Sequence, residues 1–346
     1  MSAVANRGAL GVDLGTTNIR IHARGKGIVL REPAVIAVSK DTREVKAVGR
    51  EAYEMLGRTP GNIIAVRPMA DGVIADYSLT EQMLKTFMRK VVTGPSRFFK
   101  RKVMVCVPSG ITDVERRAVR QAMDNIDMSK TFLIEETIAG AIGAGINIAE
   151  PVGSMVIDIG GGTTDIAVIS LGGLVVSTSI RVAGNAFDDD IIRYIRQKDN
   201  LLIGSRTAEE VKLRVGAATI RDQDEIRSVD IKGRDLISGL PKTVTVDTED
   251  VVEALNASLE KIGDGVRHVL ESAPPELISD VIERGIVLTG GGAMLRNIDR
   301  YLTNIADIPV GVAEHPTDCV VIGTSKALEL IHILQDSQAP SSLQYR

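Results

Sequence analysis

Short apolar runs recur along the 346-residue chain and are separated by turns rich in glycine and threonine. The runs at 9–14, 102–108 and 154–159 contain few polar positions. Such runs are typical of strands that are buried on both faces of a sheet. The first and third runs continue through a glycine–threonine turn into a second strand pattern, at 19–23 and at 164–170. Similar strand–turn–strand units therefore occur twice, about 145 residues apart.

Segments with helical spacing of apolar residues lie between the strand patterns. Residues 78–92 form one such segment, and Ser78 or Thr80 is the expected N-cap. A second predicted helix spans 109–125, and a long one begins at 248 and ends at a pair of prolines near 275. Alternating strands and helices predict an α/β fold.

Three glycine-rich turns follow apolar strands: 13–18, 158–164 and 289–293, the last of which is expected to open a helix. Glycine has no Cβ, so successive backbone N–H groups can surround an anion. The threonines beside the first two turns add hydroxyl groups, and Asp13 and Asp158 end their strands at the same place. Two carboxylates beside a polyphosphate require a cation, and Mg²⁺ suits this role. The sequence therefore predicts a polyphosphate site in a cleft between two related lobes.

Composition and other motifs narrow the class of protein. The formal net charge of −4 argues against broad nucleic-acid binding. Cys106 and Cys319 lie in apolar runs, which predicts buried thiols in a reducing compartment, and they lack metal-site spacing. No secretory pattern and no run of about 18 apolar residues is present, so a cytoplasmic chain is expected. The P-loop motif is absent, as is GxGxxG after the first strand.

The three turns resemble those of the superfamily of actin, heat-shock chaperone ATPases and sugar kinases. Within it, the chain closely resembles the bacterial actin homologues of the MreB/Mbl family, from about residue 8 to 332. The stretches RTPGNI (58–63), ADGVIADY (70–77) and GRDLISGLPKT (233–243) carry this narrower resemblance. It implies an α/β, actin-like (ribonuclease H-like) duplicated fold with two lobes, four subdomains and a nucleotide cleft between the lobes.

The resemblance also implies a division of the chain. Lobe I is expected at 1–145 with a small subdomain inserted at about 32–75, and lobe II at 146–332 with a small subdomain inserted at about 182–245. Part of 315–335 is expected to return to lobe I, and 336–346 to form a disordered tail.

By position, the resemblance implies ATP and Mg²⁺ as ligands. The implied nucleotide-binding residues are Asp13, Gly15, Thr16, Thr17, Asn18, Gly160, Gly161, Gly162, Thr163, Thr164, Glu209, Lys212, Gly290, Gly291, Gly292 and Ala293. Asp13 and Asp158 are the implied metal ligands, through water. Glu136 is the residue implied to polarise the attacking water, with help from Thr163. Without the resemblance, the sequence favours a solvated acid at a helix start for Glu136, and Thr137 beside it replaces the usual proline.

The function implied is that of a weak ATPase forming filaments, with paired protofilaments, at the inner face of the cytoplasmic membrane. There it would organise wall synthesis and maintain rod shape with membrane-bound partners. Phe98 and Phe99, flanked by basic residues, are the implied membrane loop, although they could instead fold onto the core. Val114 and Arg117 are the implied protofilament contacts, with a solvated helix face as the alternative. The rival functions are a small-molecule kinase and a chaperone-type ATPase of the same superfamily.

Overall fold

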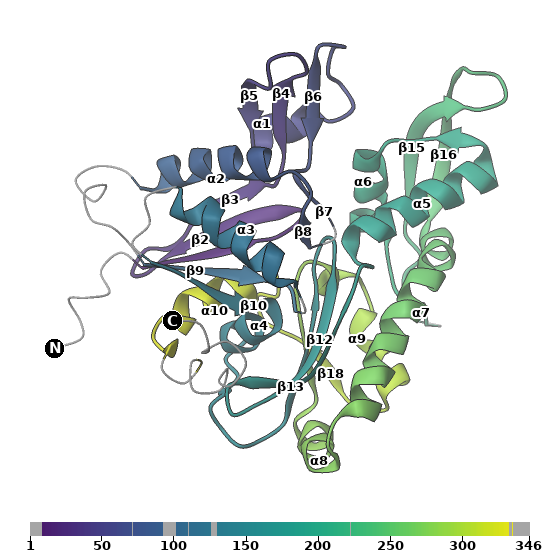
Figure 1. The fold of residues 1–346 in the computed structure, drawn as a ribbon. Helices are drawn as coiled ribbons and strands as arrows, with labels where there is room; N and C mark the ends of the chain where they lie inside the picture. The colour runs from purple at the N-terminus through teal and green to yellow at the C-terminus, as the bar shows by residue number, and fades with distance from the viewer. Residues whose placement is uncertain are drawn as a thin grey trace.

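Two five-stranded mixed sheets organise the chain (Figure 1). The computed structural model describes residues 9–70, 72–92, 102–109, 111–125, 130–221, 223–331 and 334. The first sheet has the order β10 (Lys130–Glu135), β9 (Lys102–Val107), β1 (Leu10–Leu14), β2 (Asn18–Ala23) and β3 (Gly27–Pro33). The second has the order β18 (Val310–Val312), β17 (Ile286–Thr289), β11 (Ser154–Ile159), β12 (Thr164–Ser170) and β13 (Gly173–Ile180).

The two sheets share one topology. In the first, β1, β2 and β3 form an antiparallel meander, while β1, β9 and β10 run parallel. In the second, β11, β12 and β13 form the meander, while β11, β17 and β18 run parallel. Each glycine turn joins the first two strands of its meander. The predicted pair of related units is therefore present, and both glycine turns lie at equivalent positions.

Two helices pack together between the sheets, α4 (Glu136–Gly143) and α10 (Cys319–Ala327). Their backbones approach so closely that a Cβ on Gly143 would lie 1.8 Å from the Cys319 carbonyl oxygen. A Cβ on Gly323 would lie 1.7 Å from the Ala139 carbonyl oxygen. Glycine is therefore required at this crossing. The apolar core around it contains residues of both sheets, including Met104 from β9 and Val156 from β11.

Helices cover the outer faces of both sheets. The first sheet carries α2 (Tyr77–Val91) and α3 (Asp113–Asp124). The second lobe contains α5 (Gly184–Asp199), α6 (Ser205–Val215), α7 (Thr248–Ser272), α8 (Pro275–Arg284) and α9 (Ile298–Ala306). Residues 336–346 lie outside the described residues, and the lobe and subdomain boundaries given above stay predictions.

A small sheet projects from each lobe at the same end of the molecule (Figure 1). One has the order β5 (Val45–Val48), β4 (Ile36–Ser39) and β6 (Ile63–Val66), and carries the short helix α1 (Arg50–Glu54). The other has the order β14 (Leu201–Leu202), β15 (Ser228–Asp235) and β16 (Pro241–Asp247). A two-stranded hairpin, β7 (Met69–Ala70) and β8 (Val73–Ile74), lies between the first small sheet and α2.

Two local predictions were wrong. The N-cap of α2 is Asp76, whose carboxylate accepts from the Leu79 N–H at 3.0 Å, in place of Ser78 or Thr80. The third glycine turn opens only a 3₁₀ turn, η2 (Gly292–Met294), and α9 begins later, at Ile298. The long helix does end before Pro274, but the following proline starts α8, as proline at a first helical position commonly does.

Across the described ranges, no helix is both long and apolar enough to cross a membrane.

Candidate functional site

A cavity of about 610 Å³ lies between the two lobes. All three glycine turns line it, together with the start of α4 and residues of α5 and α6. The predicted residues that line it are Asp13, Gly15, Thr16, Thr17, Asn18, Glu136, Asp158, Gly160, Gly161, Gly162, Thr163, Glu209, Lys212, Gly290, Gly291 and Gly292. Segments that are far apart in the sequence therefore meet in one cavity, large enough for a small organic ligand.

The first two glycine turns contact each other across the cavity. The Thr17 hydroxyl donates to Asn185 Oδ1 at 3.2 Å, which joins the first turn to α5. A Cβ on Gly161 would lie 1.9 Å from Thr17 Oγ1. Thr16 Oγ1 accepts from the Gly72 N–H at 3.1 Å, so the β7–β8 turn also packs on this loop. Glycine at position 161 is thus required for the two lobes to approach this closely.

The third turn contains one glycine with free space around it. Gly290 has φ +85°, and its Cβ would lie 2.3 Å from the Ile159 carbonyl oxygen. A Cβ on Gly292 would lie 2.2 Å from Ile159 Cγ2, so both glycines serve packing against β11. A Cβ on Gly291 would meet nothing within 4 Å. Gly291 is therefore the position where a ligand could approach this backbone.

Three buried carboxyl groups line the cavity, Asp13, Glu136 and Asp158, and a fourth buried carboxyl group, Asp165, is the partner of Asp158 in the β11–β12 pairing. Burial raises the pKa of each one, and repulsion from the other carboxylates of this group adds to this effect at Glu136 and Asp158. The pKa of Asp158 rises from an ordinary 3.8 to about 7, although the Thr289 hydroxyl donates to its carboxylate at 2.6 Å. The base of the cavity therefore concentrates negative charge that a cation would offset.

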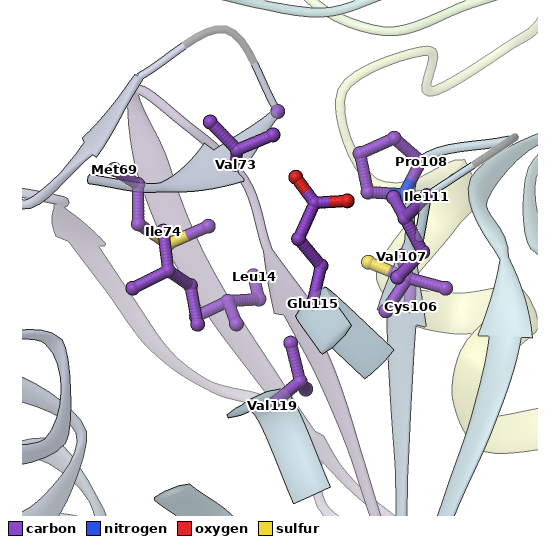
Figure 2. A pocket seen from close by; sticks show the side chains of 11 residues that line it. Leu14, Met69, Val73, Ile74, Cys106, Val107, Pro108, Ile111, Glu115 and Val119 are labelled. Carbon is purple, nitrogen blue, oxygen red and sulfur yellow. The ribbon is translucent and has the colours of Figure 1, made fainter. Parts of the chain in front are cut away.

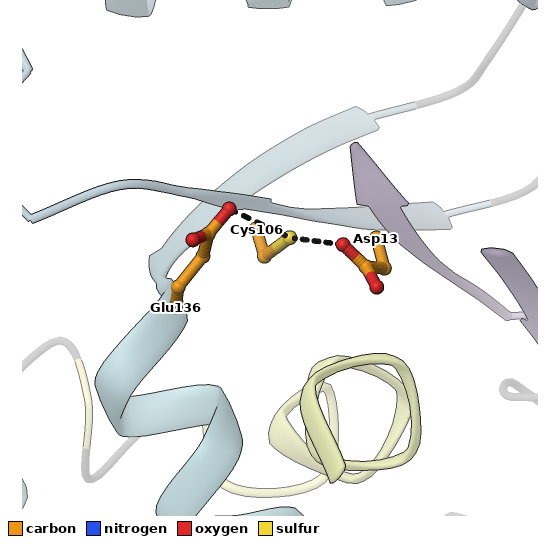
Figure 3. Close-up of side chains that lie close together, drawn as sticks. All are labelled: Asp13, Cys106 and Glu136. Carbon is orange, nitrogen blue, oxygen red and sulfur yellow. Dashed lines mark hydrogen bonds between the residues drawn. The ribbon is translucent and has the colours of Figure 1, made fainter. Parts of the chain in front are cut away.

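Cys106 lies between two of these acids (Figure 3). Its Sγ is 3.4 Å from Asp13 Oδ1 and 3.9 Å from Glu136 Oε1. Burial, with Asp13 and Glu136 nearby, raises the pKa of the thiol well above its usual value. A protonated thiol donates a weak hydrogen bond and is a poor ligand for Mg²⁺, whereas carboxylate oxygens suit that ion. The carboxylate oxygens at this end of the cavity, and not the thiol, are therefore the donors that suit Mg²⁺.

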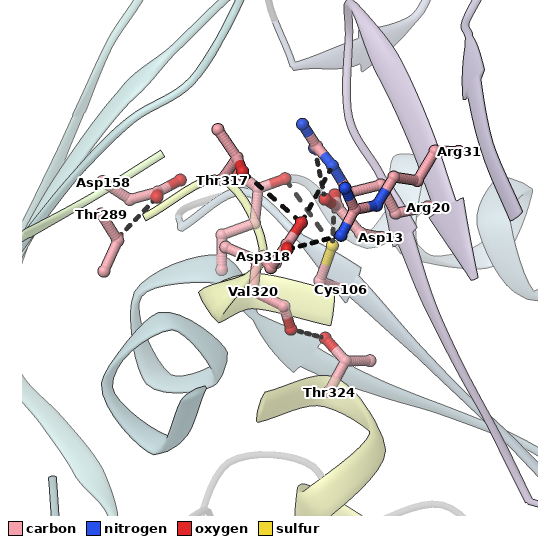
Figure 4. A network of polar contacts seen from close by, with 11 residues as sticks. Asp13, Arg20, Arg31, Cys106, Asp158, Thr289, Thr317, Asp318, Val320 and Thr324 are labelled. Carbon is pink, nitrogen blue, oxygen red and sulfur yellow. Dashed lines mark hydrogen bonds and ion pairs between the residues drawn. The ribbon is translucent and has the colours of Figure 1, made fainter. Parts of the chain in front are cut away.

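Arginine side chains balance part of this charge (Figure 4). Arg20 faces Asp13 across the β1–β2 hairpin, and its Nη1 lies 3.2 Å from Asp13 Oδ2. Asp318, at the start of α10, lies between Arg20 (3.8 Å) and Arg31 (2.6 Å). Burial still outweighs Arg20, because the pKa of Asp13 remains raised. These ion pairs join β2 and β3 of the first sheet to the start of α10.

Helices α5 and α6 form the other end of the cavity. Lys212 Nζ lies 2.8 Å from Asp188 Oδ1 and donates to the Gly184 carbonyl oxygen at 2.8 Å. Burial raises the pKa of Asp188 to about 6, although Lys212 opposes this. Glu209 accepts from the Tyr53 hydroxyl, which belongs to α1 of the other lobe. Glu209 and Lys212 therefore line the cavity as a pair of opposite charge held by other side chains.

The remaining predicted residues fall in several places. Thr164 and Ala293 are buried and do not line the cavity, and the Thr164 hydroxyl donates to the Val182 carbonyl oxygen at 2.7 Å. Thr164 therefore does not offer its hydroxyl to a ligand. Glu136 is buried with only 8% of its surface exposed, so the solvated alternative is wrong. Phe98 and Phe99 lie outside the described residues.

Several residues of the site did not emerge from the sequence as part of it, notably Arg20, Tyr53, Asn185 and Asp188. Arg20 was open to prediction, because pairing the first strand–turn–strand unit as a hairpin places it opposite Asp13. Pairing the second unit similarly places Asp165 opposite Asp158. Tyr53 reaches the site only through long-range packing, and no local pattern indicates this.

A second hollow lies between the β7–β8 turn and the start of α3 (Figure 2). Its volume of about 10 Å³ accommodates about one water molecule. Leu14, Ile74 and Val107 are among its mostly apolar lining, and the Glu115 carboxylate points into it. That carboxylate accepts from the Thr112 N–H at 2.7 Å, and the two residues form the capping box of α3. The hollow is too small for a nucleotide.

Comparison with known proteins agrees with this architecture. The MreB/Mbl protein family model matches residues 7–336. The chain is 50% identical over 321 residues to the cell shape-determining protein Mbl of Bacillus subtilis, covering 92% of this chain and 95% of that protein. It is 50% identical over 326 residues to the cell shape-determining protein MreB of Escherichia coli K12, covering 93% of each.

A solved structure agrees with the sequence comparison. MreB5 of Spiroplasma citri, in a crystal structure bound to ADP, superposes with a TM-score of 0.89 at 40% identity. The alignment covers 97% of this chain and 100% of that one. The predicted fold class is thereby confirmed as α/β, actin-like and two-lobed. The chain belongs to the MreB/Mbl family.

Proposed function

We propose that this protein binds ATP with Mg²⁺ between its lobes, hydrolyses it slowly, and assembles into membrane-associated filaments. These filaments would organise wall synthesis and maintain rod shape. The observation that carries the proposal is the interlobe cavity, in which three glycine turns surround a cluster of buried carboxyl groups. The names of the relatives, which are cell shape-determining proteins, and the ADP bound to MreB5 support it.

In this proposal the two facing glycine turns bind the phosphates. Backbone N–H groups of both turns and the hydroxyls of Thr16, Thr17 and Thr163 would donate to phosphate oxygens. The turn at Gly291 would admit the adenosine, and Glu209 with Lys212 would contact the nucleoside. Thr17 already joins the lobes through Asn185, so phosphate binding there would involve both lobes at once.

Hydrolysis is assigned to Glu136. Mg²⁺, held through water by Asp13 and Asp158, would neutralise charge on the phosphates. Glu136 begins α4 at the base of the cavity, where its carboxylate can orient a water molecule. Phosphoryl transfer depends mainly on such positioning, and Thr163 would help to hold the water. Thr137 stands where the family usually has proline, and its hydroxyl lies 3.2 Å from the hydroxyl of Ser109.

Self-association would use the exposed face of α3. Val114 exposes 68% of its surface, which is unusual for a valine on a helix of a folded protein. Arg117 is also exposed, and its Nε donates to the Asp113 carbonyl oxygen at 3.3 Å. We assign both residues to the contact that pairs two protofilaments side by side. A homopolymer of this kind requires no nucleic acid.

Membrane attachment would depend on Phe98 and Phe99. Inserting each ring contributes about 1.5–3 kcal/mol, and each nearby cation about 1 kcal/mol at an anionic leaflet. One such loop binds weakly, but a filament repeats it and gains avidity. The protein would then lie at the inner face of the cytoplasmic membrane, beside membrane-bound cell-shape and wall-synthesis proteins.

A small-molecule kinase of the same superfamily is the alternative. The experiment that separates the two measures phosphate release from γ-labelled ATP over a series of protein concentrations. A filament ATPase releases inorganic phosphate equal to the ADP formed, at a rate per molecule that rises above a threshold concentration. A rate per molecule that is constant with concentration and rises with an added acceptor would support the kinase instead.

A further inference from the structure

A hydrogen bond joins the two small subdomains where the cavity opens. Tyr53 belongs to α1, and Glu209 belongs to α6. The Tyr53 hydroxyl donates to Glu209 Oε2 at 2.5 Å. Figure 1 shows α1 and α6 in the upper part of the view, one in each lobe, at the end away from α4 and α10. Two residues 156 positions apart in the sequence therefore connect the lobes at this opening.

The surroundings of Tyr53 hold it in place. Its side chain packs against a small core of β4 and α1 that contains Ala37 and Ala52. The Arg206 guanidinium carbon lies 5.4 Å from the ring centroid, within the range of a cation–π contact. Arg206 and Glu209 are one turn apart on α6, so both contact the same tyrosine. One side chain of the first lobe thus meets two oppositely charged side chains of the second.

The position of this bond determines how strongly it resists separation of the two lobes. Two further interlobe hydrogen bonds join Ser109 N–H to Asp165 Oδ1 at 2.9 Å and Thr17 to Asn185 at 3.2 Å. These lie beside the glycine turns and the shared core at α4 and α10. If the lobes open about that core, the ends bearing α1 and α6 separate most. A bond between those ends therefore resists opening more than a bond near the pivot.

We propose that Tyr53 is a positioning residue of the nucleotide site, supplied by the opposite lobe. It orients Glu209 toward the nucleoside and must release Glu209 before the nucleotide can leave. This inference rests on the proposed function. A carboxylate has two oxygens, so Glu209 can accept from Tyr53 with one and from a ribose hydroxyl with the other. The bond and the bound nucleoside therefore stabilise each other, and exchange is slow while both are present.

The Tyr53 hydroxyl can donate its hydrogen bond at every physiological pH. Burial, together with the Glu209 carboxylate, raises the pKa of its hydroxyl to about 12. The hydroxyl therefore keeps its proton throughout the physiological range.

The test measures release of an ADP analogue that carries a fluorescent methylanthraniloyl group. The protein is loaded with this analogue, below the concentration at which it sediments, and chased with excess ATP in a stopped-flow instrument. Tyr53→Phe keeps the ring and its packing but removes the hydroxyl. We expect release to accelerate about tenfold or more, the effect of losing one hydrogen bond to a charged group.

Tyr194→Phe is the matched control. Its hydroxyl donates to Glu253 Oε2 at 2.8 Å, and both residues belong to the second lobe. This variant loses the same kind of bond, but release should stay within twofold of wild type. In a Glu209→Gln background, which alters the site itself, adding Tyr53→Phe should cause a smaller acceleration than it does in wild type.

Release from Tyr53→Phe within twofold of wild type would overturn the inference while leaving the proposed function standing. Equal acceleration in Tyr53→Phe and Tyr194→Phe would also overturn it, because the effect would then be a general loss of stability. If the wild-type protein fails to bind the analogue at all, the proposed function falls and this inference falls with it.

Discussion

Replacing Asp158 by asparagine should stabilise the metal-free protein and weaken its response to Mg-ATP. The pKa of Asp158 is raised from 3.8 to about 7, chiefly by burial. This is a shift of about 3 units, and each unit corresponds to about 1.4 kcal/mol. Ionised Asp158 therefore costs the folded state about 4 kcal/mol, and asparagine removes that cost while keeping an oxygen for the Thr289 hydroxyl.

The sign of the pH dependence follows from the same shift. Above about pH 7 the carboxyl group is ionised in both the folded and the unfolded state, so the full cost is present. Below pH 3.8 it is protonated in both, and the cost disappears. The metal-free protein should therefore gain stability as the pH falls from 7.5 toward 5. Asp13, Asp165 and Glu136, whose pKa values are also raised, act in the same direction.

Thermal melting of both proteins at pH 7.5 and pH 5.5, with and without Mg-ATP, checks this. Asp158→Asn should melt several degrees higher than wild type at pH 7.5 without metal, with a smaller difference at pH 5.5. The rise in its melting temperature on adding Mg-ATP should be much smaller than that of wild type. Asp230→Asn is the control, because exposed Asp230 also accepts from a threonine hydroxyl, Thr245, at 2.7 Å. A metal-free Asp158→Asn protein that melts below wild type at pH 7.5 would refute the reasoning.

Three further predictions concern the nucleotide, hydrolysis and the membrane. Gly291→Val should fold normally, because a Cβ there meets nothing within 4 Å, yet lose at least tenfold in ADP affinity measured by calorimetry; unchanged affinity would place the adenosine elsewhere. Glu136→Gln should keep ATP affinity but lower phosphate release by about 10²-fold or more in a coupled assay, and an unchanged rate would remove Glu136 from the mechanism. Phe98→Ser with Phe99→Ser should abolish co-sedimentation with anionic liposomes while filaments persist, and retained lipid binding would contradict the membrane loop.

The sequence was sufficient for the glycine turns and the doubled strand pattern. Both depend on local requirements, namely buried strands and a backbone that a Cβ would obstruct. Gly161 shows why this works, since the space that it leaves is filled by Thr17 of the other turn. The pattern of the turns alone indicated an anion site in a cleft.

The environment of individual acids could not be predicted in this way. Glu135 and Glu136 are adjacent and chemically alike, yet Glu135 pairs with Arg116 at 3.0 Å while Glu136 lies at the base of the cavity. Only the direction in which α4 enters the space between the lobes separates them. The Tyr53–Glu209 bond likewise depends on how two distant subdomains face each other.

The prediction of the α2 N-cap failed for a different reason. Asp76, Ser78 and Thr80 all lie within five residues, and each has a side chain that can cap a helix. Asp76 takes the role, and the Thr80 hydroxyl donates to the Asp76 carbonyl oxygen at 2.8 Å. A choice among adjacent candidates depends on where the chain turns after β8, which local sequence does not specify.

High-speed sedimentation across a protein concentration series tests the central claim most directly. The series is run with Mg-ATP, with Mg-ADP and without nucleotide, each with and without anionic liposomes. We predict a pellet that appears above a threshold concentration and that depends on nucleotide or lipid. Absence of a pellet under every condition would contradict the filament proposal and direct attention to an acceptor substrate for phosphoryl transfer.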